Sequence, residues 1–139
     1  IFVETSVPVD RVTAGLIIFR STCMACHGAD GEGLQNIAPP LKGSQYVEGP
    51  SDRLAMILLN GLQGPLTIKG QQYKFNGSMP NFGNNFDDKQ IADIIGYLHN
   101  SFVAHPPKPI GAEKIKELRT RPTGTLTEAD LLKMGDLTK

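Results

Sequence analysis

One short motif constrains this chain more than any other feature of its sequence. Cys23 and Cys26 are separated by two residues, and His27 follows Cys26 directly. The chain has 139 residues and only these two cysteines, so a framework of several disulfides is excluded. Two thiols held two residues apart, with an imidazole beside them, form a compact set of groups suited to binding a metal or a cofactor.

The spacing Cys-x-x-Cys-His is typical of haem attachment, in which the two thiols add across the two vinyl groups of haem. Each S–H adds to one C=C bond, and the histidine is thereby placed under the iron. We therefore predict one covalent haem c, attached through Cys23 and Cys26, with His27 as an axial ligand of the iron.

Two other chemical interpretations of the motif are disfavoured. A Cys-x-x-Cys pair can be a redox-active disulfide, or it can be half of a zinc site. A zinc site would need two more soft or imidazole ligands, but the remaining histidines, His99 and His105, show no ligand spacing. A thioredoxin-like protein would need a βαβ pattern, which this sequence lacks.

The second axial ligand is predicted among the four methionines. A methionine sulfur suits an electron carrier because it stabilises ferrous iron and raises the reduction potential. Met24 lies inside the attachment loop, Met134 lies in the distant tail, and Met56 falls in a predicted helix, where a core position explains it better. Met79 lies in the loop 76–82, between a glycine and a proline, and is the predicted ligand.

His27 also needs a hydrogen-bond acceptor for its second ring nitrogen, since that bond fixes the orientation of the ring. Residues 39–43, with the sequence Pro-Pro-Leu-Lys-Gly, lie just downstream. A proline carbonyl can accept this bond, and proline has no N–H of its own to compete. The same residues would also suit a simple proline-rich turn, and the pattern alone leaves both interpretations open.

Hydrophobic periodicity predicts three main helices, at residues 10–22, 51–60 and 87–100. Asp10 and Ser51 are the expected N-caps of the first two helices, and Asp87 with Gln90 resembles a capping box on the third. The third helix has an apolar stripe that we expect to be buried, formed by Ile91, Ile94, Ile95 and Leu98.

A small β-hairpin is predicted between the second and third helices. Its strands are expected at residues 66–68 and 73–75, with the turn at residues 69–72. The predicted fold class is therefore all-α, with short helices around one haem and a small hairpin before the loop of the methionine ligand.

The C-terminal part of the chain differs in composition from the first hundred residues. Residues 105–109 form a stiff, proline-rich connector, and two short helices are expected at residues 112–119 and 128–134. We expect residues 1–103 to form the haem domain and residues 104–139 to form a C-terminal extension packed on it. The alternative is a segment that becomes ordered only against a partner protein.

Composition excludes two classes of function. Fourteen basic and fourteen acidic residues give a net charge of zero, so nucleic-acid binding has no electrostatic basis. No stretch approaches the roughly 18 apolar residues of a membrane span. The sequence begins with Ile1 rather than methionine, so we expect a processed protein or an excised domain.

Together these features resemble class I cytochromes c, over about residues 10–103. Within that family, the chain resembles the bacterial monohaem modules that serve, or are fused to, periplasmic dehydrogenases and copper nitrite reductases. Gly15 and Phe19 resemble the family's helix-crossing pair, at which glycine lets the last helix approach closely. The partner face of that crossing is matched by Ile94, Tyr97 and Leu98.

The resemblance also implies roles for the loop residues. Pro39, Leu41 and Gly43 match the family's Pro-x-Leu-x-Gly, whose proline carbonyl accepts a hydrogen bond from the axial histidine. Met79 followed by Pro80 matches the loop of the sixth ligand.

The implied function is single-electron transfer without enzymatic activity. The implied partners are redox proteins, namely a dehydrogenase, a reductase or an oxidase. The implied location is periplasmic or otherwise extracytoplasmic, either free or tethered to a membrane or a larger protein. A competing function, a peroxidase or a gas sensor, would need an open sixth coordination position.

One departure from the family is the absence of tryptophan. It leaves Tyr46, Tyr73 or Arg53 as candidate partners of a haem propionate, without a ranking among them. His99 is expected at the surface of the last main helix.

Overall fold

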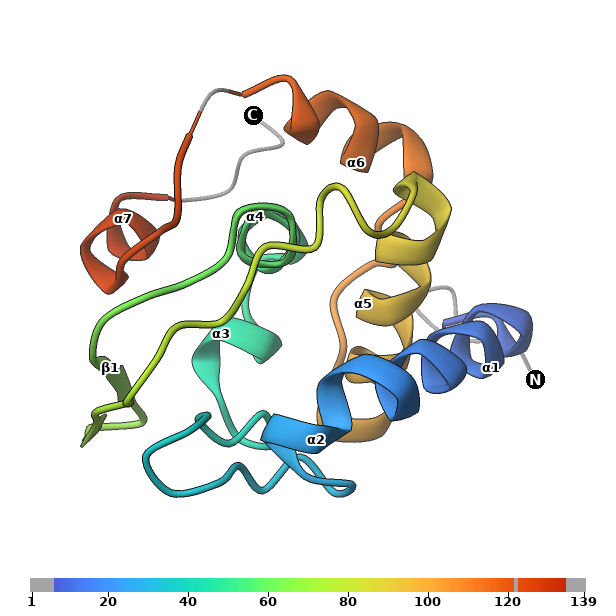
Figure 1. The fold of residues 1–139 in the computed structure, drawn as a ribbon. Helices are drawn as coiled ribbons and strands as arrows, with labels where there is room; N and C mark the ends of the chain where they lie inside the picture. Colours follow the sequence, from blue (N-terminus) through green and yellow to red (C-terminus); the bar gives the residue numbers. More distant parts are fainter. Residues whose placement is uncertain (1–6, 122, 135–139) are drawn as a thin grey trace.

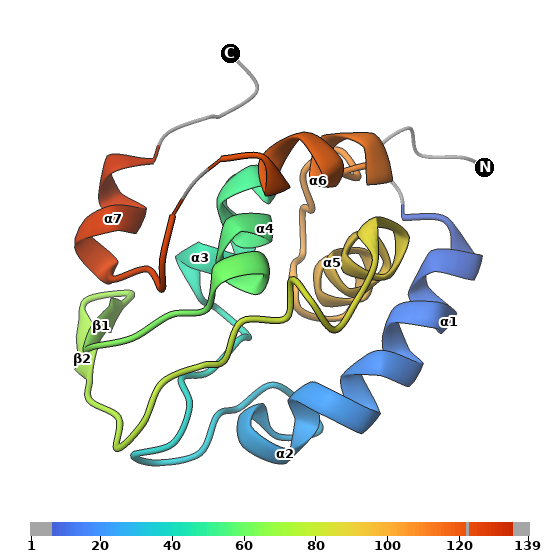
Figure 2. The ribbon, with the colours of Figure 1, turned by 45° about the horizontal axis from the view of Figure 1, so that its top comes forward.

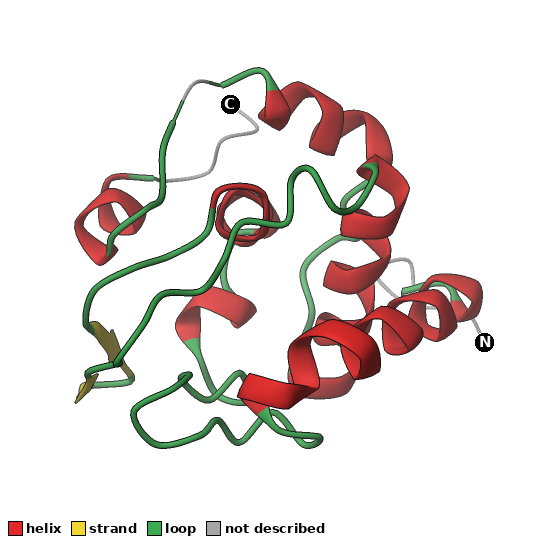
Figure 3. Ribbon diagram, viewed as in Figure 1, coloured by secondary structure: helices red, strands yellow, loops and turns green. Residues whose placement is uncertain are grey.

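The computed structural model describes residues 7–121 and 123–134, and Figure 1 shows its helices and one small hairpin. The helical elements are α1 (Val9–Ile18), the π-helical turn η1 (Phe19–Cys23), α2 (Met24–His27), α3 (Gln45–Glu48), α4 (Ser51–Asn60), α5 (Asp88–Phe102), α6 (Ala112–Arg119) and α7 (Glu128–Lys133). The strands are β1 (Leu66–Ile68) and β2 (Gln71–Tyr73). Figure 3 shows how much of the remaining chain is loop, as the high glycine and proline content implies.

The crossing of α1 and α5 organises one side of the molecule (Figure 2). A Cβ atom added at Gly15 would lie 2.1 Å from the Asp93 carbonyl oxygen and 2.6 Å from the Tyr97 Cβ, so only glycine permits this approach. The Phe19 ring packs against the Tyr97 ring with 5.0 Å between centroids. The predicted helix-crossing pair is therefore in contact with the predicted face of α5.

The end of α1 and the N-caps of α1 and α4 differ from their predictions. The α-helix ends at Ile18, and the chain continues through η1 into α2, which ends at Gly28 with φ 85°. A π-helical turn accommodates an extra residue, which a 3.6-residue periodicity does not reveal. The predicted N-caps Asp10 and Ser51 are also wrong, because the capping positions are occupied by prolines, which make no side-chain cap.

The predicted capping box on α5 is confirmed: the Asp87 side chain accepts from the Gln90 N–H, and the Gln90 side chain accepts from the Asp87 N–H. Every residue of α5 from Ile91 to His99 is buried. Helix α4, whose predicted bounds are confirmed, contributes a second buried run from Leu54 to Leu59. These two helices form the centre of the hydrophobic core.

The hairpin forms with a shorter turn than predicted. Strands β1 and β2 pair antiparallel, with Leu66 opposite Tyr73 and Ile68 opposite Gln71. The turn is the two residues Lys69 and Gly70, which have φ 49° and φ 86°. Positive φ at both positions is typical of a tight hairpin turn, but lysine rarely adopts it, so this register carries no clear sequence signal.

The C-terminal extension crosses α4 and α5 on the side away from α2 (Figures 1 and 2). Four of its apolar side chains are at most 1 % exposed, namely Ile115, Leu118, Leu126 and Leu131. Helix α7 begins with a capping box between Thr127 and Asp130. Short helices of this kind are marginal alone in water, so their burial against the core stabilises them.

The structure overturns the expected surface position of His99, whose residue exposure is 0 %. Its Nε2 donates a hydrogen bond to the Val47 carbonyl oxygen at 3.2 Å, which ties α5 to α3. Burial lowers the pKa of His99 below its ordinary value of 6.5, the hydrogen bond to Val47 opposes this effect, and the positive charge of Arg11 adds to it. The residue therefore acts as a neutral core side chain.

We expect acid to destabilise the fold partly through His99. As the pH falls below the ordinary histidine pKa, the unfolded state takes up a proton that folded His99 resists, so the free energy of unfolding decreases. The variant His99→Gln keeps a donor for Val47 but does not titrate. Between about pH 7 and pH 5, denaturant titrations should show a smaller loss of stability in the variant than in the parent. Equal losses in the two proteins would contradict the prediction.

Among residues 7–121 and 123–134, no helix combines the length and the apolar character needed to cross a bilayer.

Candidate cofactor site

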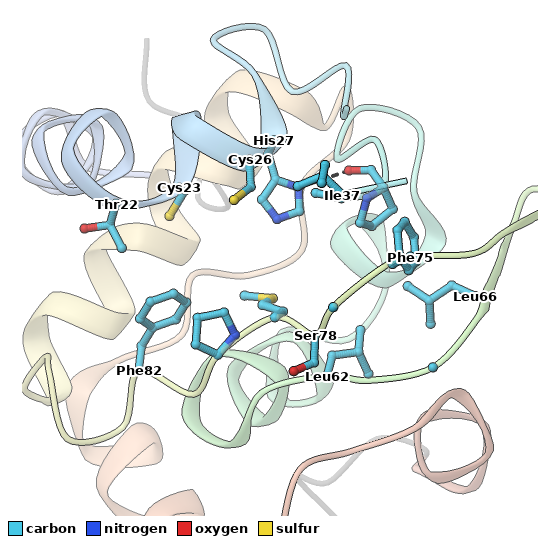
Figure 4. Close-up of a pocket in the computed structure, with 16 residues that line it drawn as sticks. Thr22, Cys23, Cys26, His27, Ile37, Leu62, Leu66, Phe75, Ser78 and Phe82 are labelled. Carbon is cyan, nitrogen blue, oxygen red and sulfur yellow. Dashed lines mark hydrogen bonds between the residues drawn. The ribbon is translucent and has the colours of Figure 1, made fainter. Parts of the chain in front are cut away.

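A largely apolar cavity of about 290 Å³ lies between the attachment motif and the loop that contains Met79. In Figure 4, Cys23, Cys26 and His27 lie on one side of this cavity, and Ser78 and Phe82 lie on the other. The cavity walls come from four separate segments of the chain, at residues 22–27, 37–39, 62–66 and 75–82.

The end of the first helical segment places the attachment motif at the cavity. Cys23 is the last residue of η1, and Cys26 and His27 belong to the single turn of α2. Helix α2 ends at Gly28, whose positive φ turns the chain away and leaves the motif at the cavity edge. Cys23 is half-buried and Cys26 is exposed.

His27 is buried, and its Nδ1 donates a hydrogen bond to the Pro39 carbonyl oxygen at 3.0 Å. A carbonyl can only accept, so the proton is on Nδ1 and the lone pair is on Nε2. Burial lowers the pKa of His27, and the bond to Pro39 partly opposes this shift. The two interpretations of residues 39–43 are thus resolved in favour of an acceptor for the histidine.

Leu41 lies beside this acceptor. Its N–H donates to the Gly31 carbonyl oxygen at 2.8 Å, which pins the segment after Pro39. The Leu41 side chain borders a smaller cavity of about 60 Å³, which Pro39 and His27 also line. Leu41 therefore belongs to the wall on the histidine side of the site.

The thiol chemistry disfavours a redox-active disulfide. Burial, together with the smaller effect of the neighbouring Cys26, raises the pKa of the Cys23 thiol to about 11. A redox-active Cys-x-x-Cys pair instead needs a lowered thiol pKa. In the part of the chain that the structure describes, no group of three or more His, Cys, Asp or Glu side chains could hold a metal ion.

Met79 lines the cavity from the opposite loop, and its backbone is fixed on both sides by Leu62. The Met79 N–H donates to the Leu62 carbonyl at 2.9 Å, and the Leu62 N–H donates to the Met79 carbonyl at 3.1 Å. Gly61 allows this approach, since a Cβ there would lie 2.8 Å from the Met79 carbonyl oxygen. Sequence reasoning did not identify Leu62 as a partner of Met79. The signal that the sequence offers there is a pair of nearby glycines, at residues 61 and 64.

Two of the three propionate candidates, Tyr46 and Arg53, already have partners in the structure. The Tyr46 hydroxyl donates to Glu128 Oε2 at 2.6 Å, and the Arg53 guanidinium lies 5.0 Å from the Tyr46 ring centroid. Burial, followed by the hydrogen bond to Glu128, raises the pKa of Tyr46 to about 12. The Tyr46 hydroxyl is thus already engaged by the C-terminal extension.

The residues present fit a haem. An apolar cavity suits the ring, two thiols on one helical turn suit the vinyl groups, and a neutral imidazole with a fixed tautomer suits the iron. A thioether on the opposite loop supplies a second soft donor of the kind that iron takes in electron carriers.

The chain belongs to the cytochrome c family, whose model matches residues 12–102. It is 33 % identical over 107 residues to cytochrome c-552 of Thermus thermophilus. This match covers 71 % of this chain and 79 % of that protein. It is 27 % identical over 109 residues to the cytochrome c subunit of the quinone alcohol dehydrogenase of Gluconobacter oxydans strain 621H. That match covers 77 % of this chain but only 22 % of the subunit.

Among solved structures, the c-type cytochrome XoxG of Methylobacterium extorquens AM1 aligns with a TM-score of 0.49 at 24 % identity, over 79 % of this chain and 65 % of that one. The family match confirms the cytochrome c fold, here with a small two-stranded antiparallel sheet. It also confirms haem c as the cofactor and electron transfer as the role.

Proposed function

We propose that this chain is a monohaem electron carrier in which His27 and Met79 are the two axial ligands of the iron. The observation that carries the proposal is that both cysteines, His27 and Met79 line one and the same cavity. His27 is also hydrogen-bonded to Pro39 there. When bound, the haem supplies an iron that alternates between ferrous and ferric states and so stores one electron.

The chain's own residues bind and orient the group. Cys23 and Cys26 anchor it covalently, and the Pro39 carbonyl keeps the His27 proton on Nδ1, so that Nε2 is available as the ligand atom. The apolar wall, which includes Leu62, limits the access of water to the cofactor. Solvent exposure is one of the properties that set the reduction potential of the iron.

We also propose that residues 1–103 form the haem domain and residues 104–139 a C-terminal extension. The family model ends at residue 102, just before the proline-rich connector, and this supports the division. The extension would then be an addition to the common haem-binding unit.

The proposed partners are a dehydrogenase that donates one electron at a time and a terminal acceptor such as a reductase or an oxidase. Several relatives are named as cytochrome c subunits of dehydrogenases, which supports such a donor. We propose an extracytoplasmic location, in the periplasm, and no catalysis of its own, since two filled axial positions leave no place for a substrate on iron.

Carbon monoxide separates this function from that of a peroxidase or a gas sensor. With Met79 bound, the ferrous protein should bind carbon monoxide poorly at neutral pH, and the ferric protein should show the methionine-to-iron charge-transfer band. Protein unfolded in guanidinium, which frees the sixth position, serves as the positive control. Rapid binding by the native ferrous protein would overturn the proposal.

A further inference from the structure

Arg119, at the end of α6, reaches from the C-terminal extension to the segment that follows Met79. Its Nε donates to Asp88 Oδ1 at 2.5 Å and its Nη2 donates to the Phe86 carbonyl at 2.6 Å. Its Nη1 donates to the Gly83 carbonyl. A single side chain therefore holds two carbonyls of an irregular loop and the first residue of α5.

This arrangement depends on the guanidinium group. Its planar fork presents several donors in fixed directions, which a lysine ammonium cannot reproduce. Asp88 compensates the charge, and both side chains are little exposed, at 27 % for Arg119 and 29 % for Asp88. The loop's own turn is closed by the N–H groups of Asn85 and Phe86, which donate to the Phe82 carbonyl, and the Phe82 N–H donates to the Leu58 carbonyl of α4 at 2.9 Å. Arg119 adds the contacts that join the Gly83 and Phe86 carbonyls to the C-terminal extension.

The extension holds the other side of Met79 through the backbone. Leu126 pairs in parallel with Leu62: the Leu126 N–H donates to the Gly61 carbonyl at 3.1 Å, and the Gln63 N–H donates to the Leu126 carbonyl at 2.8 Å. Leu62 pairs in turn with Met79. Leu126 is 1 % exposed, so its side chain is fixed in the core as well.

We propose that the C-terminal extension positions the axial methionine, with Arg119 and Leu126 holding the Met79 loop from its two sides. The proposal rests on the assignment of Met79 as an iron ligand. On this proposal, Arg119 and the pairing of Leu126 with Leu62 favour the loop arrangement seen here, in which Met79 lines the cavity, over an arrangement in which Met79 leaves it. Such differential contacts shift the balance between the two arrangements.

The variant Arg119→Gln tests the proposal against a matched control, Arg121→Gln. Arg121 lies two residues further on, its side chain is 38 % exposed, and its Nη2 donates to Glu117 Oε1 of α6 at 2.7 Å. The readouts are the alkaline pH at which the methionine-to-iron band is lost and the rate of carbon monoxide binding to the ferrous protein. In Arg119→Gln we expect that pH to fall by about one unit and carbon monoxide binding to quicken by about tenfold. Arg121→Gln should match the parent.

Global stability is measured on the same proteins by denaturant titration. Arg119→Lys, which keeps the charge but not the fork, serves as a second and milder variant with an expected intermediate shift. A loss of global stability with an unchanged band and unchanged carbon monoxide binding would show that Arg119 only supports the fold, and would overturn the inference. If the parent protein itself lacks the band, the assignment of Met79 fails first.

Discussion

In the double variant Cys23→Ala/Cys26→Ala, we expect covalent haem to be absent and the cooperative fold to be largely lost. Both thiols line the cavity, and no other cysteine can replace them. Without the haem, a cavity of about 290 Å³ with largely apolar walls would remain between the attachment motif and the Met79 loop. The cost of exposing or leaving empty such a space is comparable to the total stability of a small domain.

Haem staining on a denaturing gel and circular dichroism check this expectation. Met24→Leu is the matched control, since Met24 lies between the two cysteines and packs against the core, and leucine is close to methionine in volume. The control should retain haem and fold. A well-folded, cooperatively unfolding apo-protein from the double variant would show that the cofactor does not organise this chain.

In Met79→Ala, we expect the haem to remain attached while the reduction potential falls. Loss of the soft sulfur removes a ligand that favours ferrous iron, and water or a lysine would take its position. The expected decrease is on the order of 0.2 V, a fraction of the ~0.8 V range over which axial ligands set haem potentials. Potentiometric titration measures it, and the methionine-to-iron band should disappear at the same time.

Met56→Leu is the control for this substitution. Met56 is 3 % exposed, lies in α4 and belongs to the hydrophobic core. Its replacement should leave the potential and the absorption band unchanged, with a stability cost below about 1.5 kcal/mol. If Met79→Ala keeps both the band and the potential, another residue is the sixth ligand.

Features encoded by short, regular spacing could be predicted from the sequence. The bounds of α4 follow from a run of apolar residues that ends at Gly61, and the capping box of α5 follows from Asp87 and Gln90. The crossing at Gly15 was predicted from family likeness, and the structure shows the steric reason for it.

Features that depend on contacts between distant segments could not be predicted. The sequence pattern did not indicate that the His99 side chain is buried. Its hydrogen-bond partner, the Val47 carbonyl, belongs to the short helix α3, and periodicity did not reveal that helix. The contacts of Arg119 with Gly83 and Phe86 involve backbone carbonyls, which every residue has. A sequence pattern marks donor side chains but not the particular carbonyl that each one reaches.

The pairing of Leu62 with both Met79 and Leu126 joins the C-terminal extension to the loop that contains Met79. The motif Cys23–His27 and the crossing of α1 with α5 need no residue beyond α5, whereas the ladder around Met79 is complete only when Leu126 arrives. A chain that ended after α5 would keep the pair between Leu62 and Met79 but lack the pair between Leu62 and Leu126. The loop that contains Met79 would also lose the contacts of Arg119 with the Gly83 and Phe86 carbonyls, so this loop and the C-terminal extension form one structural unit.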